Sequence, residues 1–238
     1  MERVLEKMWE NGPFFYQTDA ARLTTDTVLL ADFARVKGSE RGADLGCASG
    51  ALMLLLLWRE PRLSMTGFEI SPDAVALARE NIFLNGLEGR ADLACGDFRT
   101  TVQELAAGGY DFIISNPPYF ESGRGALAPD DGRAAARAEL CCSIGEVCAA
   151  AARLCRSGGR VFFSYRPEGL NRLLAEMTGA RLEPKRLRFV HHRRDKESFL
   201  VLVEGRKDGN PGLKAEAPLI LYTDQGEESE EYRRIYHR

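Results

Sequence analysis

Short apolar segments alternate with segments of helical pattern from about Gly42 to Glu204. This alternation indicates a parallel, doubly wound sheet whose helical crossovers are right-handed. We therefore predict an α/β fold with a Rossmann-like sheet of seven strands. The expected strands are 43–46, 63–69, 90–95, 111–115, 160–165, 185–191 and 199–204, and the expected helices are 51–59, 72–85, 98–107, 133–156 and 168–178.

Chain length bounds the domain organisation. With 238 residues, of which 45% are hydrophobic and 28% charged, the chain fits one large globular α/β domain with a small appendage. We expect an N-terminal extension at 1–40 that packs on the main domain, the α/β domain at 41–222, and a charged C-terminal tail at 223–238.

The composition also indicates the cellular compartment in which the protein is expected. The apolar run Ala51–Trp58 is too short to span a bilayer, and no signal peptide opens the chain. Six cysteines without paired spacing are typical of reduced thiols. We expect a cytoplasmic protein that has no membrane partner.

Polar residues stand at or just beyond the ends of four expected strands, and these residues are Asp44, Glu69, Asp97 and Asn116. Open α/β sheets bind ligands beyond the carboxyl ends of their strands. These side chains therefore predict a ligand site at that edge of the sheet.

The small-residue turn Asp44–Gly50 follows the first of these strands. It is similar to a dinucleotide-binding turn, because glycine lets the backbone approach a ligand closely. Asp44 would repel a pyrophosphate, however, and favours a cationic ligand. Glu69 is placed to accept ribose hydroxyls and Asp97 to meet an adenine amine, so the combination points to S-adenosylmethionine.

The tetrapeptide Asn116-Pro117-Pro118-Tyr119 ends the strand at 111–115 abruptly. Proline has no amide hydrogen and forces the preceding residue into an extended conformation. The Asn116 side-chain oxygen and the Pro117 carbonyl are then free to hold the hydrogens of a planar amine, while Tyr119 offers a face for stacking. Asn-Pro also opens ordinary turns, so the tetrapeptide gains its meaning from the polar strand ends before it.

Together these motifs resemble the class I S-adenosylmethionine-dependent methyltransferases that methylate amino groups. Further segments are similar to the bacterial family typified by the adenine-37 amino-methyltransferase of valine tRNA. They are Thr25–Ala31, Ala136–Glu139, Gly158–Val161 and Pro218–Tyr222, and the resemblance covers roughly 23–222.

The resemblance implies a class I methyltransferase fold whose last strand is antiparallel, and S-adenosylmethionine as the cofactor. It implies a catalytic role for Asn116, Pro117, Pro118 and Tyr119. The implied cofactor-binding residues are Thr25, Asp26, Asp44, Gly46, Ala48, Gly50, Glu69, Ile70, Asp97, Phe98 and Asn116. An alternative for Asp26 is that it caps a helix over 27–34.

Two residues depart from the family pattern. Ala48 replaces a glycine, which we expect to be tolerated if its φ is negative. Ala138 stands where the family leads us to expect histidine, so no substrate role is carried over to that position.

The net charge of −3 carries no strong nucleic-acid signature, but the segment from Arg181 to Lys196 is rich in Lys and Arg. We expect it to bind RNA through Lys185, Arg186, Arg188, Arg193 and Arg194. The alternative is a solvated strand edge. Whether the acidic segment Glu227–Glu231 covers this basic stretch is left open.

The leading hypothesis for the substrate is adenine in RNA, with tRNA first. The alternatives are guanine in rRNA, a protein glutamine amide, or a module that binds cofactor or RNA without catalysis. Cys141, Cys148 and Cys155 recur every seven residues on one expected helix, about 10 Å apart in succession, so they predict a packed face and no metal site. The oligomeric state is expected to be monomer or homodimer.

Overall fold

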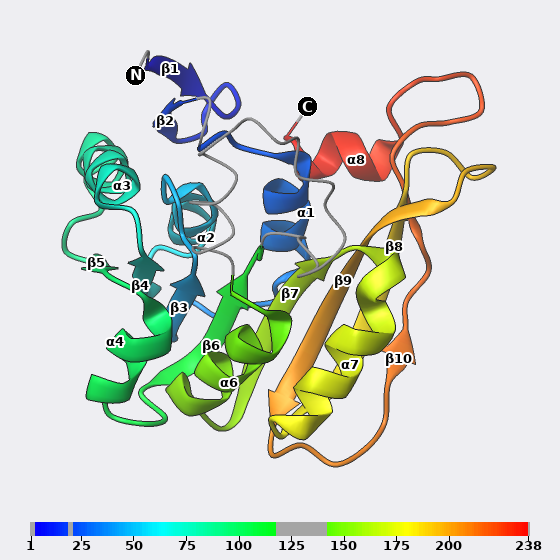
Figure 1. The fold of residues 1–238 in the computed structure, drawn as a ribbon. Helices are drawn as coiled ribbons and strands as arrows, with labels where there is room; N and C mark the ends of the chain where they lie inside the picture. The colour runs from blue at the N-terminus through cyan, green and yellow to red at the C-terminus, as the bar shows by residue number, and fades with distance from the viewer. Residues whose placement is uncertain (1–2, 19–20, 118–141, 238) are drawn as a thin grey trace, which may run out of the picture.

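The computed structural model describes residues 3–18, 21–117 and 142–237. Its main sheet has the strand order β10-β8-β9-β7-β6-β3-β4-β5, and β11 also pairs with β8 (Figure 1). The strands are β3 (Arg41–Leu45), β4 (Ser64–Glu69), β5 (Ala91–Cys95), β6 (Tyr110–Ser115), β7 (Cys155–Tyr165), β8 (Leu182–His191), β9 (Ser198–Lys207), β10 (Lys214–Ala215) and β11 (Leu219–Ile220).

Every neighbouring pair in this sheet is parallel except those of β9, which runs antiparallel to both β7 and β8. The predicted seven strands and the antiparallel last strand are thus confirmed. The strands β10 and β11 were not predicted, because two residues are too few to produce a hydrophobic pattern.

Helices cover both faces of the sheet (Figure 1). One core contains apolar side chains of α1, α2, α3 and α8, and the other those of α4, α6 and α7. Neighbouring residues of β6 alternate between the two cores, since Phe112 and Ile114 belong to the first and Ile113 to the second. The helices are α1 (Thr25–Phe33), α2 (Ala51–Arg59), α3 (Pro72–Leu84), α4 (Phe98–Glu104), α6 (Ile144–Leu154), α7 (Leu170–Gly179) and α8 (Glu230–Ile235), with a 3₁₀ turn at Pro167–Gly169.

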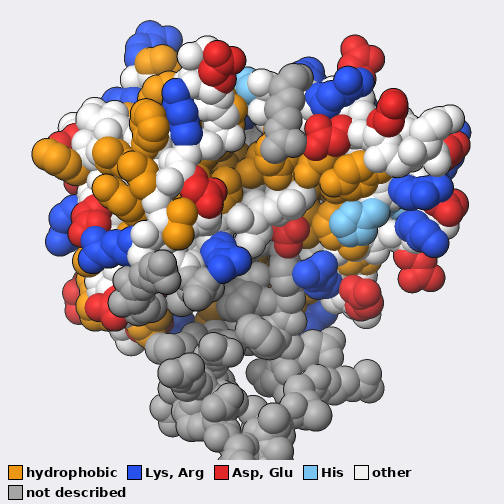
Figure 2. Space-filling model, turned by 90° about the horizontal axis from the view of Figure 1, so that it is seen from above, with side chains coloured by type: hydrophobic (Ala, Val, Ile, Leu, Met, Phe, Trp, Pro, Cys, Tyr) orange, Lys and Arg blue, Asp and Glu red, His pale blue; other side chains and the backbone are white. Residues whose placement is uncertain are grey.

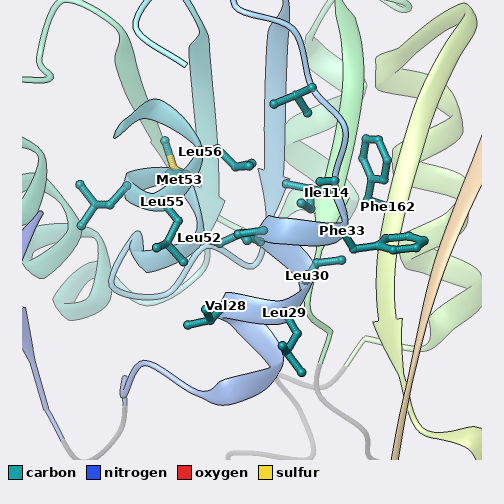
Figure 3. Close-up of a cluster of buried hydrophobic side chains, with 14 of the residues drawn as sticks. Val28, Leu29, Leu30, Phe33, Leu52, Met53, Leu55, Leu56, Ile114 and Phe162 are labelled. Atoms are coloured by element: carbon teal, nitrogen blue, oxygen red, sulfur yellow. The ribbon is translucent and has the colours of Figure 1, made fainter. Parts of the chain in front are cut away.

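Helix α2 is buried along most of its surface, as its apolar sequence predicted. Figure 3 shows its leucines facing the side chains of α1 and the sheet residues Ile114 and Phe162. Helix α3 begins as predicted, with Ser71 accepting a hydrogen bond from the Ala74 amide and Pro72 in the first turn. These helices fix the turns that precede them.

Helix α6 differs from the prediction. Its described part begins at Ile144, capped by Ser143 and Glu146, and ends at Leu154 rather than Arg156. Cys155 pairs with Tyr110 of β6, so sheet hydrogen bonding takes over two residues before the expected end of the helix. The predicted place of Cys155 on this helix is therefore wrong, although Cys148 and Cys155 are both packed in the same core as predicted. Cys141 and residues 133–140 lie outside the described residues.

The N-terminal extension forms a hairpin of β1 (Val4–Lys7) and β2 (Phe14–Gln17), followed by α1. Asn81 and Asn85 of α3 each use their side-chain amide to bond the backbone N–H and C=O of one β2 residue, Tyr16 and Phe14 respectively. The two side-chain amides thus form hydrogen bonds with β2 of the kind that a neighbouring strand would form. They attach the hairpin to α3.

Residues 223–237 do not remain a solvated tail. Helix α8 buries Tyr232 and Ile235 against the core that contains α1. Apolar side chains at positions 232, 235 and 236 share one helical face, a pattern that the high charge of the segment obscured. No helix in the described part of the chain is long and apolar enough to cross a membrane.

Candidate functional site

Two cavities lie at the carboxyl ends of the parallel strands. The first, of about 290 Å³, is lined by residues that include Thr24, Thr27, Asp44, Ala48 and Asn116. The second, of about 490 Å³, shares Ala21 and Ala48 with the first and extends past Glu69 to Ser71 and Leu77 on α3. The structure therefore brings the predicted residues Asp44, Glu69 and Asn116 to one continuous depression.

The turn after β3 is held tightly. The amides of Gly46 and Cys47 both donate to the Phe68 carbonyl at the end of β4. Gly46, Ala48 and Gly50 all have positive φ, at 79°, 47° and 77°. Ala48 was expected to be tolerated if its φ were negative, and this condition is not met, because the turn places the alanine in the left-handed region.

Asp44 is 1% exposed, and neither of its carboxylate oxygens has a hydrogen-bond partner in the described part of the chain. Burial, and secondarily the charge of Glu69, raises the pKa of Asp44 to about 8. An ionised carboxylate without a partner is costly in an apolar interior. A cationic ligand in the first cavity would supply that partner, as the ammonium of S-adenosylmethionine does if it binds here.

Glu69 bridges the turn and the start of α3. One of its oxygens accepts from the Ala48 amide at 2.9 Å and the other from the Ser71 amide at 2.9 Å. A carboxylate oxygen can accept a second hydrogen bond, so ribose hydroxyls in the second cavity fit this carboxylate. Ile70, the next residue, is half-buried and lines neither cavity.

Asp97 caps α4 by accepting from the Arg99 amide, and its carboxylate also pairs with the Arg99 guanidinium. Hydrogen bonding from Arg99 lowers the pKa of Asp97. Asp97 and Phe98 line neither of the two cavities, and Phe98 packs against the core under α4. Their contact with adenine stays a prediction.

Asn116 follows β6 directly and lies beside two side chains that the sequence analysis did not single out. Its amide nitrogen Nδ2 donates to Thr27 Oγ1 at 3.3 Å, and Ser164 Oγ donates to its oxygen Oδ1 at 2.5 Å. A buried hydroxyl residue one position before the end of β7 is a weak sequence signal, because such residues are common in strands. Pro118 and Tyr119 lie outside the described residues.

The start of α1 also differs from the prediction. Thr24 is the N-cap and the helix begins at Thr25, so Asp26 is a first-turn residue and not the cap. Thr24 and Thr27 line the first cavity, whereas Thr25 hydrogen-bonds to Tyr232 of α8. Thr25 and Asp26 were expected to contact the cofactor, but neither lines the cavity. This part of the wall is formed by Thr24 and Thr27, which are three positions apart.

The expected RNA-binding residues fall into two groups. Arg186 is 7% exposed, forms ion pairs with Glu204 and Glu216, and lies over the ring of Phe33. Its guanidinium is engaged in the interior, and its contact with RNA stays a prediction. Arg188 is paired with Glu231, and Lys185 donates to the Asn210 carbonyl.

Arg193 and Arg194 lie instead in the connection between β8 and β9, where Arg194 and Lys196 are exposed. In the same connection His192 stacks on Phe199 with ring centroids 4.0 Å apart. Glu231 of the acidic segment thus pairs with Arg188 of the basic stretch. Arg194 and Lys196, at the C-terminal end of this stretch, stay exposed. Among the described residues no group of three His, Cys, Asp or Glu side chains is arranged to hold a metal.

Known proteins resemble the chain in sequence and in fold. Residues 20–130, which include Asp44, Glu69, Asp97 and Asn116, match the family model described as methyltransferase small domain. A relative from Porphyromonas gingivalis named tRNA1(Val) (adenine(37)-N6)-methyltransferase is 31% identical over 227 residues, 91% of this chain and 87% of the relative. A release factor glutamine methyltransferase from Rhodospirillum rubrum is 40% identical over 114 residues, 47% of this chain and 34% of the relative.

A solved structure supports the same architecture. A crystal structure described as that of a predicted O-methyltransferase from Agrobacterium tumefaciens has a TM-score of 0.73 at 21% identity, with 90% of this chain and 96% of that chain covered. The comparison shows a shared fold.

Ala48→Gly is expected to stabilise the protein. Glycine adopts a positive φ without a Cβ clash, and the relief outweighs the added freedom of the unfolded chain, for a net gain of about 0.5–1 kcal/mol. A thermal melt should shift upward by roughly 2–4 °C. Ala149→Gly, at an exposed position within α6, should instead lose about 1 kcal/mol, and a similar loss for Ala48→Gly would contradict the strain.

Asp44 gives a pH dependence of stability. Its pKa of about 8 in the folded protein exceeds the unfolded value of about 4, so the folded state binds the extra proton between these values. The unfolding free energy therefore falls as pH rises from 4 to 8, by at most about 1.4 kcal/mol per unit. Asp44→Asn should flatten the fall of melting temperature between pH 5 and 8. Exposed Asp92→Asn serves as control, and equal slopes in all three proteins would refute the assignment.

Proposed function

Because this chain belongs to the family of the tRNA1(Val) (adenine(37)-N6)-methyltransferases and is an S-adenosylmethionine-dependent methyltransferase, we propose that it methylates the exocyclic amine of adenine in RNA, with tRNA as the first candidate. The observation that carries the proposal is the position of Asn116. Its side-chain amide is fixed at the wall of the cavity that also contains the unpaired Asp44 carboxylate.

The residues fit the cofactor in the following way. Asp44 would hold the ammonium of its methionine part, Glu69 its ribose hydroxyls, and Asp97 its adenine amine. The cofactor supplies an electrophilic methyl group on a sulfonium. Because that methyl is already activated, the protein contributes mainly by aligning the acceptor, which reaches effective molarities on the order of 10⁵ M or more.

The acceptor is a weak nucleophile, since the lone pair of an aromatic amine is delocalised into the ring. Asn116 Oδ1 and the Pro117 carbonyl accept the two amine hydrogens, which favours a pyramidal nitrogen and localises the lone pair. Tyr119 stacks on the base, a contact worth roughly 1–3 kcal/mol. A base within a helix cannot reach such a site, so the target adenine must be in a loop or be flipped out.

The β8–β9 connection is the surface we assign to RNA. Arg194 and Lys196 provide exposed charge there, next to Arg193, which pairs with Asp195 and donates to the Asp224 carbonyl. The stacked His192–Phe199 pair provides an aromatic face. Figure 2 shows histidine side chains beside Lys and Arg side chains on the face seen from above. Basic groups bind phosphates, and aromatic faces stack with unpaired bases.

A protein glutamine amide is the second candidate. Its support is the release factor glutamine methyltransferase that matches 47% of this chain. An amide nitrogen is also planar and weakly nucleophilic, so the same Asn116 geometry would serve it. Guanine in rRNA, and binding without catalysis, are further outcomes that one labelling experiment separates.

The proposal predicts transfer of labelled methyl groups from S-adenosylmethionine into unmodified tRNA, recovered after digestion as N6-methyladenosine. Asn116→Ala should reduce the rate by about 10²–10³-fold, since it removes an acceptor aligned with the reacting amine. Cofactor binding measured by calorimetry should persist, because the other expected cofactor contacts, those of Asp44 and Glu69, remain. Label in protein or in guanosine would refute adenine in RNA, and cofactor binding without label in any fraction would favour a binding module.

The assigned RNA surface predicts a change in salt dependence. The double variant Arg194→Ala, Lys196→Ala should raise KM for RNA about tenfold and reduce the slope of log affinity against log salt by roughly 1–2, because each lost phosphate contact removes about 0.7–0.9. The matched control Lys37→Ala, Arg172→Ala removes two exposed charges elsewhere. Equal effects in both double variants would show a non-specific charge effect.

A further inference from the structure

We propose that the outer face of His192 is a second base-binding site, which holds an unpaired base of the same RNA strand at a distance from the methylated adenine. This inference rests on the proposed function and narrows it. A strand that fills both positions must be unpaired on at least one side of the target. The substrate is therefore an adenine within a loop rather than one flipped out of a duplex.

The ring pair of His192 and Phe199 has a firm base. Phe199 is half-buried and packs against the core that contains α1. The imidazole of His192 lies on the Phe199 ring, with centroids 4.0 Å apart and planes inclined by 10°. Because Phe199 covers one face of the imidazole and His192 is nevertheless exposed, the opposite face is accessible in the described part of the structure.

The backbone around His192 is also held. The Tyr222 amide donates to the His192 carbonyl at 2.8 Å, and the Lys196 amide donates to the Arg193 carbonyl at 3.1 Å. The Lys196 carbonyl oxygen lies 2.7 Å from Nδ1 of the neighbouring His191. The imidazole is thus positioned before a base arrives, which lowers the entropic cost of stacking.

Strand register gives the distance between this ring pair and the acceptor position. Asn116 is bonded to Ser164 of β7, and Ser164 is opposite Leu202 of β9. Phe199 comes three residues before Leu202, and because β9 is antiparallel to β7, it lies beyond the carboxyl edge at which Asn116 stands. With β7 between β6 and β9, a rise of about 3.3 Å per residue and a strand spacing of about 4.8 Å put the two residues roughly 14 Å apart.

That distance fits a base further along the strand and not the immediate neighbour of the target. Stacked nucleotides follow one another at about 3.4 Å along a strand, so the separation corresponds to roughly four stacked steps, or fewer where the strand is extended. An adjacent nucleotide would have to span the whole distance with one backbone repeat, which is too short. At least one nucleotide therefore lies between the methylated adenine and the base on His192.

Basic side chains lie near the path between the two positions. Arg166 follows β7, is exposed, and donates from Nη1 to the Phe199 carbonyl at 2.9 Å. Arg194 and Lys196 are exposed in the connection that carries His192. These charges attract the phosphates of the intervening nucleotides, while stacking holds the base itself.

The first test compares two RNAs that present the same adenine, one in an unpaired loop and one as a single bulge in a duplex. The wild type should have a KM about tenfold lower for the loop RNA, as expected for one additional stacked base. His192→Ala should lose most of this preference. Its kcat for the loop RNA should stay within about threefold, because the stacked base is remote from the reacting atoms.

Two further variants serve as controls. His192→Phe keeps an aromatic ring without a titratable group and should keep the preference. His237 is also exposed and stacks on Trp9 with ring centroids 4.3 Å apart, so His237→Ala removes a similar pair elsewhere and should behave as the wild type. The inference is overturned if the wild type does not distinguish the two RNAs, if His192→Ala keeps the preference, or if His237→Ala loses as much.

A second readout does not require methyl transfer. A short, unstructured, uridine-rich RNA that carries one 2-aminopurine should lose fluorescence when this base stacks on the protein. The wild type and His192→Phe should quench it, whereas His192→Ala should bind about tenfold more weakly and quench less at saturation. Equal affinity and quenching in the wild type and His192→Ala would overturn the inference. A wild type that methylates neither RNA but shows quenching dependent on His192 would contradict the proposed substrate alone.

Discussion

The arrangement of the site depends on a buried carboxylate that has no hydrogen-bond partner among the described residues. Asp44, the residue before the end of strand β3, is 1% exposed, and the Glu69 charge adds to the burial that raises its pKa to about 8. Such a group opposes folding at neutral pH, so it is stable there only because the surrounding strands and the turn at Gly46–Gly50 are strongly determined. The same burial favours binding of a cation, because a cation beside Asp44 stabilises the ionised carboxylate and lowers the raised pKa.

The register of the parallel strands then places the other site residues near Asp44. Leu45 pairs opposite Phe68 on one side of β3, and Asp44 pairs opposite Ile114 on the other, so β3, β4 and β6 end at nearly the same level. Glu69 and Asn116 follow directly from those strand ends. The N-terminal extension contributes the remaining wall, through Thr24 and Thr27 of α1 and through Ala21. The extension is thus part of the site although it lies outside the alternating α/β pattern.

Sequence was sufficient for the sheet and for the acidic strand ends, because both are local patterns of apolar runs and the residues that stop them. It could not supply the contacts of Asn116 with Ser164 and Thr27, since the first depends on the register between β6 and β7 and the second on where α1 lies relative to β6. The sign of φ at Ala48 could not be predicted for a similar reason, because a small residue in a turn fits either sign until the backbone around it is known. The ends of α1 and α6 shifted where a threonine cap and sheet pairing with Tyr110 competed with helix.

Charge in the sequence is also not the same as charge available to a ligand. In the stretch Arg181–Lys196, all three guanidinium nitrogens of Arg186 bond to Glu204, Glu216 or the Phe33 carbonyl, and those of Arg188 bond to Glu231 or the Ala217 carbonyl. A guanidinium held in this way would have to give up some of these bonds to bind phosphate with the same nitrogens. Under the proposed function, the electrostatic attraction of RNA would come from the open end of the stretch, in the β8–β9 connection. That end begins where β8 finishes, at the same edge of the sheet as Ser164 and Asn116, so phosphate binding there would direct an unpaired base toward the site.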